Sequence, residues 1–143
     1  MRWQTLLKQQ SNMDLNEYQD KAMSTCMNSC RNISYMLLNL VGEVGELSSK
    51  IAKAIRKKQV SIGGKTSIGR NCFMVRDDNP AMFDFDVLAF DEELKKEAGD
   101  ILWQLSGLCS IMGWKLNDVA QMNLDKLASR KERGVIDGDG DNR

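Results

Sequence analysis

The sequence contains no histidine, one proline and few aromatic residues: three tryptophans, two tyrosines and four phenylalanines among 143 residues. Without histidine, the chain cannot form a histidine-dependent catalytic triad, a histidine-ligated zinc site or the usual pH switch near neutrality. A single proline favours long uninterrupted helices over a turn-rich β protein. These absences exclude several classes of enzyme and indicate an all-α protein.

Neither sign of charge is in excess, because 20 lysines and arginines balance 20 aspartates and glutamates. Nonspecific binding to nucleic acid or to an anionic membrane needs a positive surplus, so we expect neither partner. No apolar run is long enough for a signal peptide or for the roughly 20 residues of a transmembrane helix. The four cysteines form no C-x-x-C pair, and we interpret them as buried or half-buried thiols. We therefore expect a soluble, cytoplasmic protein.

The length suits one domain, and an apolar content of 42% is enough for a core. Apolar periodicity predicts a bundle of four main helices, at about residues 15–27, 33–58, 91–112 and 117–131. We expect a polar lead-in at 1–13, a helical domain at 14–134 and an Asp/Gly-rich tail at 135–143. Residues 59–89 hold glycines and a turn signal, which predicts a long irregular insertion between the second and third helices.

The second expected helix has a regular apolar stripe, which predicts that one side of it faces a core. The stripe consists of Ile33, Met36, Leu37, Leu40, Val41, Val44, Leu47, Ile51, Ala54 and Ile55. The first expected helix has Asp14 as an N-cap, with Glu17 three residues later.

Two helices carry matching acidic steps, Glu43-Val44-Gly45-Glu46 and Glu97-Ala98-Gly99-Asp100. The spacing of three places both carboxylates of a step on the same helical face. Each glycine costs about 0.8–1 kcal/mol in a helix interior, and like charges at this spacing repel, so both steps accept a penalty. Small residues allow two helix backbones to approach closely. Close approach would bring four carboxylates together, and such a cluster is stable only around cations.

A set of oxygen ligands without histidine suits a hard ion, Mg²⁺ or Mn²⁺. Because Mg²⁺ usually binds through carboxylates and substrate phosphates together, the pattern predicts a site for a nucleotide polyphosphate. An ordinary solvated helix face stays open as an alternative, since Glu46 and Lys50 have the favourable i, i+4 order.

A longer match supports the first interpretation. The segments Leu38-Asn39-Leu40-Val41-Gly42-Glu43-Val44-Gly45-Glu46-Leu47 and Glu97-Ala98-Gly99-Asp100-Ile101-Leu102-Trp103-Gln104-Leu105 resemble the MazG-like family of all-α nucleoside triphosphate pyrophosphohydrolases. The run Asn123-Leu124-Asp125-Lys126-Leu127-Ala128-Ser129-Arg130 is similar to the last helix of that family. Gly42 stands where the family signature usually has its first glutamate, and the spacer between Glu46 and Glu97 is longer than usual.

The resemblance implies magnesium-dependent cleavage of a nucleoside triphosphate to the monophosphate and pyrophosphate, for nucleotide-pool control or removal of unwanted nucleotides. It implies metal-binding and catalytic roles for Glu43, Glu46, Glu97 and Asp100. It also implies phosphate contacts for Lys126 and Arg130, with Asn123 as a further candidate. Together with the apolar surface that a few helices leave uncovered, it implies a homodimer or homotetramer.

Three further residues are candidates for substrate binding. Lys50 and Lys53 follow Glu46 by one and two turns and can reach phosphate oxygens, although a solvated basic face is the simpler interpretation. Trp103 follows Asp100 by one turn and can stack on a base, although core packing is the simpler interpretation. The competing hypothesis for the whole chain is a helical interaction module that has lost catalysis, with its acids in salt bridges to Lys50, Lys126 or Arg130. A di-iron carboxylate bundle is excluded because it needs E-x-x-H steps.

Overall fold

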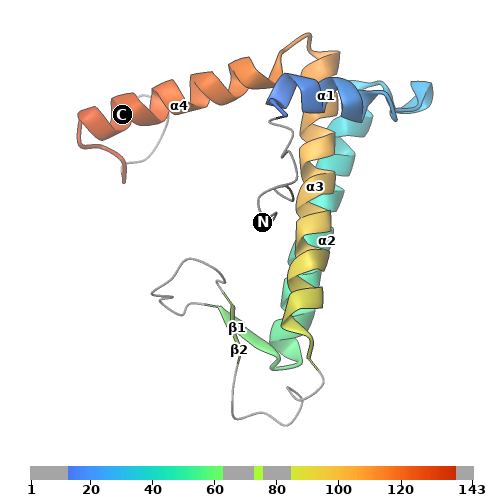
Figure 1. Ribbon diagram of the computed structural model, residues 1–143, viewed down its shortest axis with the longest axis vertical. Coiled ribbons are helices and arrows are strands. Elements are labelled where there is room, and N and C mark those ends of the chain that lie inside the picture. The colour runs from blue at the N-terminus through green and yellow to red at the C-terminus, as the bar shows by residue number, and fades with distance from the viewer. Residues whose placement is uncertain (1–12, 63–72, 76–84, 138–143) are drawn as a thin grey trace, which may run out of the picture. The chain divides into compact units, whose positions relative to one another are not determined.

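The computed structural model describes residues 13–62, 73–75 and 85–137, in which four α-helices dominate (Figure 1). The expectation of an all-α protein is thereby confirmed, with one short antiparallel hairpin in addition. Most of the expected insertion and tail, and nearly all of the lead-in, lie outside the described residues. The elements in order are α1 (Leu15–Met23), the 3-10 turn η1 (Asn28–Cys30), α2 (Ile33–Arg56), β1 (Val60–Ile62), β2 (Phe73–Val75), α3 (Val87–Ile111) and α4 (Leu116–Glu132).

The chain divides into two compact units, which are described separately. One unit comprises the residues up to Ile33 and those from Ser106 onward, and the other comprises Ser34–Leu105. Across the described residues, no helix combines the length and the apolar character that crossing a membrane requires. Cys26, Cys30 and Cys109 are buried free thiols, as expected, while Cys72 lies outside the described residues.

Helix α1 begins as expected, but it ends four residues earlier than the sequence predicts. The Asp14 side chain accepts a hydrogen bond from the Glu17 backbone N–H at 2.8 Å. At the other end, the Ser24 and Thr25 hydroxyls donate to carbonyls of the last turn, at 2.6 and 2.7 Å. Such local bonds compete with continued helix, which explains why α1 stops at Met23.

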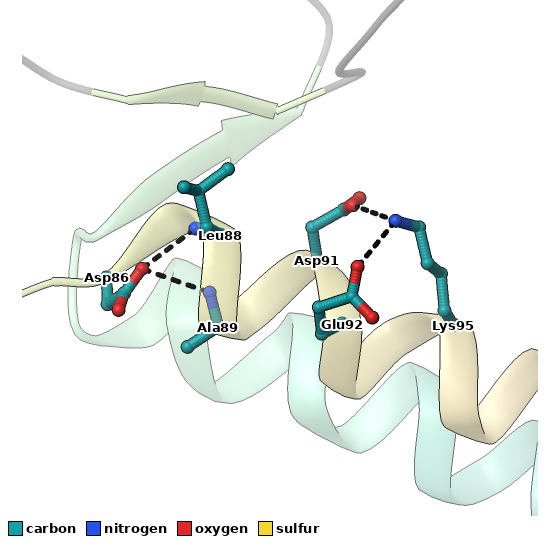
Figure 2. Close-up of polar contacts among 6 residues, drawn as sticks. All are labelled: Asp86, Leu88, Ala89, Asp91, Glu92 and Lys95. Carbon is teal, nitrogen blue, oxygen red and sulfur yellow. Dashed lines mark hydrogen bonds and ion pairs between the residues drawn. The ribbon is translucent and has the colours of Figure 1, made fainter. Parts of the chain in front are cut away.

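Helix α3 begins at Val87 rather than near Asp91, so the expected start was wrong by one turn. The Asp86 carboxylate accepts hydrogen bonds from the backbone N–H groups of Leu88 and Ala89, both at 3.0 Å (Figure 2). An aspartate in this position satisfies N–H groups that the first turn leaves without helical partners. Asp91 therefore lies inside the helix, where it pairs with Lys95 at 2.8 Å.

In the first unit, a buried glutamine fastens α1 to the turn between α3 and α4. The Gln19 side chain is 4% exposed. It donates to the Ser110 hydroxyl at 3.0 Å and to the Trp114 carbonyl at 2.9 Å, and it accepts from the Leu116 N–H at 2.9 Å. Gly113 ends α3 with a φ of +71°, a backbone conformation that favours glycine.

In the second unit, α2 and the first part of α3 run antiparallel and side by side (Figure 1). Only part of the expected apolar stripe on α2 is covered. Met36 and Ala54 are buried, whereas Val41 is 72% exposed and the neighbouring Leu38 is 76% exposed. The prediction that the whole stripe faces a core was therefore wrong for the single chain.

Candidate metal and phosphate site

Three of the four predicted carboxylates meet between α2 and α3. Glu43 from α2 and Glu97 and Asp100 from α3 each offer an oxygen within 4.8 Å of the other two. The spacing of three along α3 places Glu97 and Asp100 on one helical face, and the antiparallel arrangement places Glu43 opposite them. Glu46, one turn further along α2, is exposed and lies outside this group.

The glycines of the acidic steps do not have the role that the sequence suggested. A Cβ built on Gly42, Gly45 or Gly99 meets no atom within 4 Å in the described part of the chain. Within this chain, none of these glycines makes a close contact between the two helices. The expectation of a glycine-mediated approach was wrong for α2 against α3.

The negative charges of the cluster lie close enough to repel one another. Burial raises the pKa of the Glu43 carboxyl, and the negative charges of Asp100, Glu46 and Glu97 raise it further. Glu46 thus influences the cluster through its charge although it is not one of the three grouped ligands. Because the neighbouring negative charges make the Glu43 carboxyl harder to ionise, a bound cation would relieve this repulsion.

The geometry fits a divalent cation bound by oxygen. Two ligands on opposite sides of an octahedral Mg²⁺ are about 4.2 Å apart, given metal–oxygen distances of about 2.1 Å. The 4.8 Å limit within which the oxygens of Glu43, Glu97 and Asp100 lie is only slightly wider. At most one pair among three ligands can be opposite, and adjacent ligands of such an ion are about 3.0 Å apart, so the three oxygens must move closer together to share one ion.

Two polar neighbours of the cluster were not among the predicted site residues. The Asn39 amide donates to Glu43 Oε1 at 3.2 Å, from one turn earlier on α2. Glu93 lies one turn before Glu97 on α3, and its Oε2 is 3.6 Å from Lys50 Nζ. Both stand four residues from a predicted ligand, and this spacing was the signal in the sequence that could have revealed them.

Lys50 contacts the cluster directly. Its Nζ lies 3.2 Å from Glu97 Oε1, and its side chain is 33% exposed. Lys53 is exposed on α2, and Trp103 is half-buried on α3, one turn after Asp100. The same Lys50–Glu97 ion pair is also the kind of contact that the non-catalytic hypothesis anticipates.

The remaining predicted residues lie on α4, in the other unit. Asn123 and Lys126 are exposed and line an open pocket of about 840 Å³ together with Trp114 and Met122. Arg130 is buried, with 8% of its surface exposed. Asn123, Lys126 and Arg130 thus belong to a unit separate from that of the carboxylates.

The sequence matches a known protein family. Residues 31–135 match the model of the MazG nucleotide pyrophosphohydrolase domain. The chain belongs to the MazG family. The matched range contains both acidic steps and all of α4.

A phage protein is also similar to this MazG-family chain. It is the Gene 37 protein of Mycobacterium phage L5, which is 36% identical over 115 residues, covering 80% of each chain. No solved structure matches the sequence significantly. The sequence match therefore assigns the family, and the structure of this chain alone gives the geometry of the acidic cluster.

Proposed function

We propose that this MazG-family protein is a magnesium-dependent nucleoside triphosphate pyrophosphohydrolase. It would convert ribo- or deoxyribonucleoside triphosphates to monophosphates and pyrophosphate, for control of nucleotide pools or removal of unwanted nucleotides in the cytoplasm. The observation that carries the proposal is the convergence of Glu43, Glu97 and Asp100 from two helices, with oxygens within 4.8 Å of one another. Oxygen ligands of this kind suit Mg²⁺, with Mn²⁺ as a substitute.

The residues divide the work as follows. Glu43, Glu97 and Asp100 would hold the ion, with Glu46 as the fourth acidic group. When bound, a divalent ion neutralises phosphate oxygens and makes a water molecule more acidic. One carboxylate of the set takes the proton of the attacking water. The water oxygen bonds to the α-phosphorus, the bond from that phosphorus to the bridging oxygen breaks, and pyrophosphate leaves.

Cationic and aromatic side chains are proposed to bind the rest of the nucleotide. Lys50 already lies at the edge of the carboxylate cluster, 3.2 Å from Glu97. Lys53 follows it by about one turn on the same helix. On α4, Lys126, Arg130 and Asn123 are proposed contacts for phosphate. Trp103 is the proposed contact for the base.

Product analysis tests the reaction. The protein is incubated with a panel of ribo- and deoxyribonucleoside triphosphates, with Mg²⁺ and then with EDTA, and the products are separated by ion-exchange chromatography. Release of monophosphate and pyrophosphate in equal amounts, only with metal, is the expected result. Diphosphate with orthophosphate would mean that a different bond is cleaved, and no turnover of any substrate would contradict the proposal.

One observation favours a second candidate, a helical interaction module without catalysis. The Lys50–Glu97 pair at 3.2 Å partly neutralises the acidic cluster without any metal. Thermal unfolding with and without millimolar Mg²⁺ separates the two candidates, because an ion that binds only the folded state raises the melting temperature. A clear rise supports the hydrolase, and an unchanged melting temperature supports the module.

We also propose that the protein is a homodimer or homotetramer. Leu38 and Val41 are 76% and 72% exposed on α2, and their apolar surface would be covered by a second copy. Light scattering coupled to gel filtration gives the mass directly. A particle of 16.2 kDa, the mass of one chain, would contradict this part of the proposal.

A further inference from the structure

Lys50 is shared between two glutamates, of which only one belongs to the acidic cluster. Its Nζ lies 3.2 Å from Glu97 Oε1 and 3.6 Å from Glu93 Oε2. The side chain of Glu97 is 11% exposed, whereas that of Glu93 is 55% exposed. Glu93 and Glu97 are four residues apart on α3, so they lie on the same face and present their carboxylates in a row.

This arrangement creates a competition for Glu97. A divalent cation held by Glu43, Glu97 and Asp100 needs the carboxylate that Lys50 contacts in the structure. The ammonium and the metal ion also repel each other at short range. This repulsion favours a shift of Lys50 away from Glu97 when the cation binds, and the Glu93 carboxylate already lies 3.6 Å from the Lys50 ammonium.

We propose that Glu93 is a positioning residue that retains the Lys50 ammonium when Glu97 turns to the metal. This inference rests on the proposed function. Held by Glu93, Lys50 stays at the edge of the cluster and points its charge at the phosphate chain of the nucleotide. Without Glu93, Glu97 is the one of these two glutamates left to pair with the Lys50 ammonium. The ammonium then competes more strongly with the incoming cation for Glu97.

The neighbouring residue supplies a matched control. Glu92 carries the same charge and lies on the same helical turn, but its carboxylate pairs with Lys95 at 2.8 Å (Figure 2). Lys95 also contacts Asp91 at 2.8 Å, so this second ion-pair group contains neither Lys50 nor Glu97. The substitutions Glu93→Gln and Glu92→Gln therefore change the net charge equally and differ in the contact with Lys50.

The experiment measures Mn²⁺ binding to the full chain without nucleotide, from the electron paramagnetic resonance signal of the free ion. Glu93→Gln is expected to weaken binding about tenfold, within the range found for groups that support metal ligands. Glu92→Gln should have a much smaller effect. In a Lys50→Gln background, which removes the competing ammonium, the effect of Glu93→Gln should disappear.

The variant with both Lys50→Gln and Glu93→Gln tests whether Glu93 acts through Lys50. If Glu93→Gln weakens Mn²⁺ binding equally with and without Lys50, then Glu93 acts only through its charge and the inference is overturned. An equal effect of Glu92→Gln overturns it as well, while the hydrolase proposal stands. If the unaltered protein binds no Mn²⁺, both proposals fail together.

A kinetic measurement supplies an independent readout. Because Lys50 would contact phosphate in the ground state and the transition state alike, Glu93→Gln should raise KM with little change in kcat. Glu93→Asp keeps a carboxylate on the same turn and should recover part of the lost affinity. A fall in kcat alone, with Glu93→Asp no better than Glu93→Gln, would contradict a positioning role through Lys50.

Discussion

The Asn39 amide donates a hydrogen bond of 3.2 Å to Glu43 Oε1, across one turn of α2. Glu43 is the only ligand that α2 contributes to the three-carboxylate group, so this bond controls how the helix presents its oxygen. A hydrogen bond to a carboxylate restricts its rotation and leaves its other oxygen in a defined direction. Asn39 is therefore a supporting residue of the candidate metal site.

Replacing Asn39 with alanine is expected to weaken Mg²⁺ binding and to lower kcat/KM by about tenfold or more, as is usual for groups that orient metal ligands. Isothermal titration with Mg²⁺ and initial rates on the best substrate measure the two effects. Ser49→Ala, an exposed change on the same helix, is the control. Equal behaviour of the two variants would show that the bond to Glu43 has no functional role.

Removing a metal-binding carboxylate should lower activity more than removing a residue that orients such a carboxylate. Asp100→Ala is expected to lower kcat/KM by at least about 100-fold, because supporting groups alone cost about 10–100-fold. Glu46→Ala is expected to abolish turnover as well, although Glu46 lies outside the group of three. Circular dichroism should show unchanged helix content in both variants, and full activity in both would refute the site assignment.

Local spacing predicted which carboxylates share a helical face, but not how the two helices contact each other. The pair Glu97 and Asp100 follows from helical periodicity alone, and so does the Asp14 cap. Which carboxylate of α2 joins that pair depends on the rotation and stagger of α2 against α3. The sequence treated Glu43 and Glu46 alike, whereas the structure selects Glu43 for the cluster.

The same limit explains the predictions that were wrong. Val41 belongs to a regular apolar stripe, but periodicity does not state how much of a stripe the same chain covers. Gly45 was expected at a close helix contact, yet open space surrounds the position of its missing Cβ in the part of the chain described here. Asp86 was overlooked as a helix start because the acidic run at residues 91–93 also suits the first turn of a helix. Each of these depends on tertiary arrangement or on the capping bonds of one side chain.

Gln19 provides a test of the first unit. Gln19→Leu removes three hydrogen bonds and leaves the Leu116 N–H without its side-chain acceptor. The expected loss is about 2–4 kcal/mol in the free energy of unfolding, from lost bonds and an unsatisfied buried group. Urea unfolding measures it. Gln121→Leu is the control, since Gln121 is exposed on α4 and its amide donates to Asp125 one turn away, at 2.7 Å. Similar losses in both variants would contradict the anchoring role.

The raised pKa of Glu43 predicts that this residue lowers stability when no metal is present. A carboxyl that holds its proton more tightly in the folded state than in the unfolded state costs stability once it ionises. The cost is absent below its ordinary pKa of 4.5, grows as the pH rises through the raised pKa, and is complete above it. Glu43→Gln keeps an oxygen for Asn39 to bond and removes the charge, so it should raise the melting temperature in EDTA at pH 7.

Melting temperatures measured at low pH and with added Mg²⁺ distinguish this charge effect of Glu43 from a general change in packing. The difference in melting temperature between Glu43→Gln and the unaltered protein should shrink toward zero as the pH falls below 4.5, where Glu43 is protonated in both states. Added Mg²⁺ should stabilise the unaltered protein more than the variant, because the ion needs the charge that the variant lacks. A stabilisation that is independent of pH would mean that the glutamine simply packs better. Loss of stability at pH 7 would mean that the negative charge of Glu43 is already compensated in the folded protein.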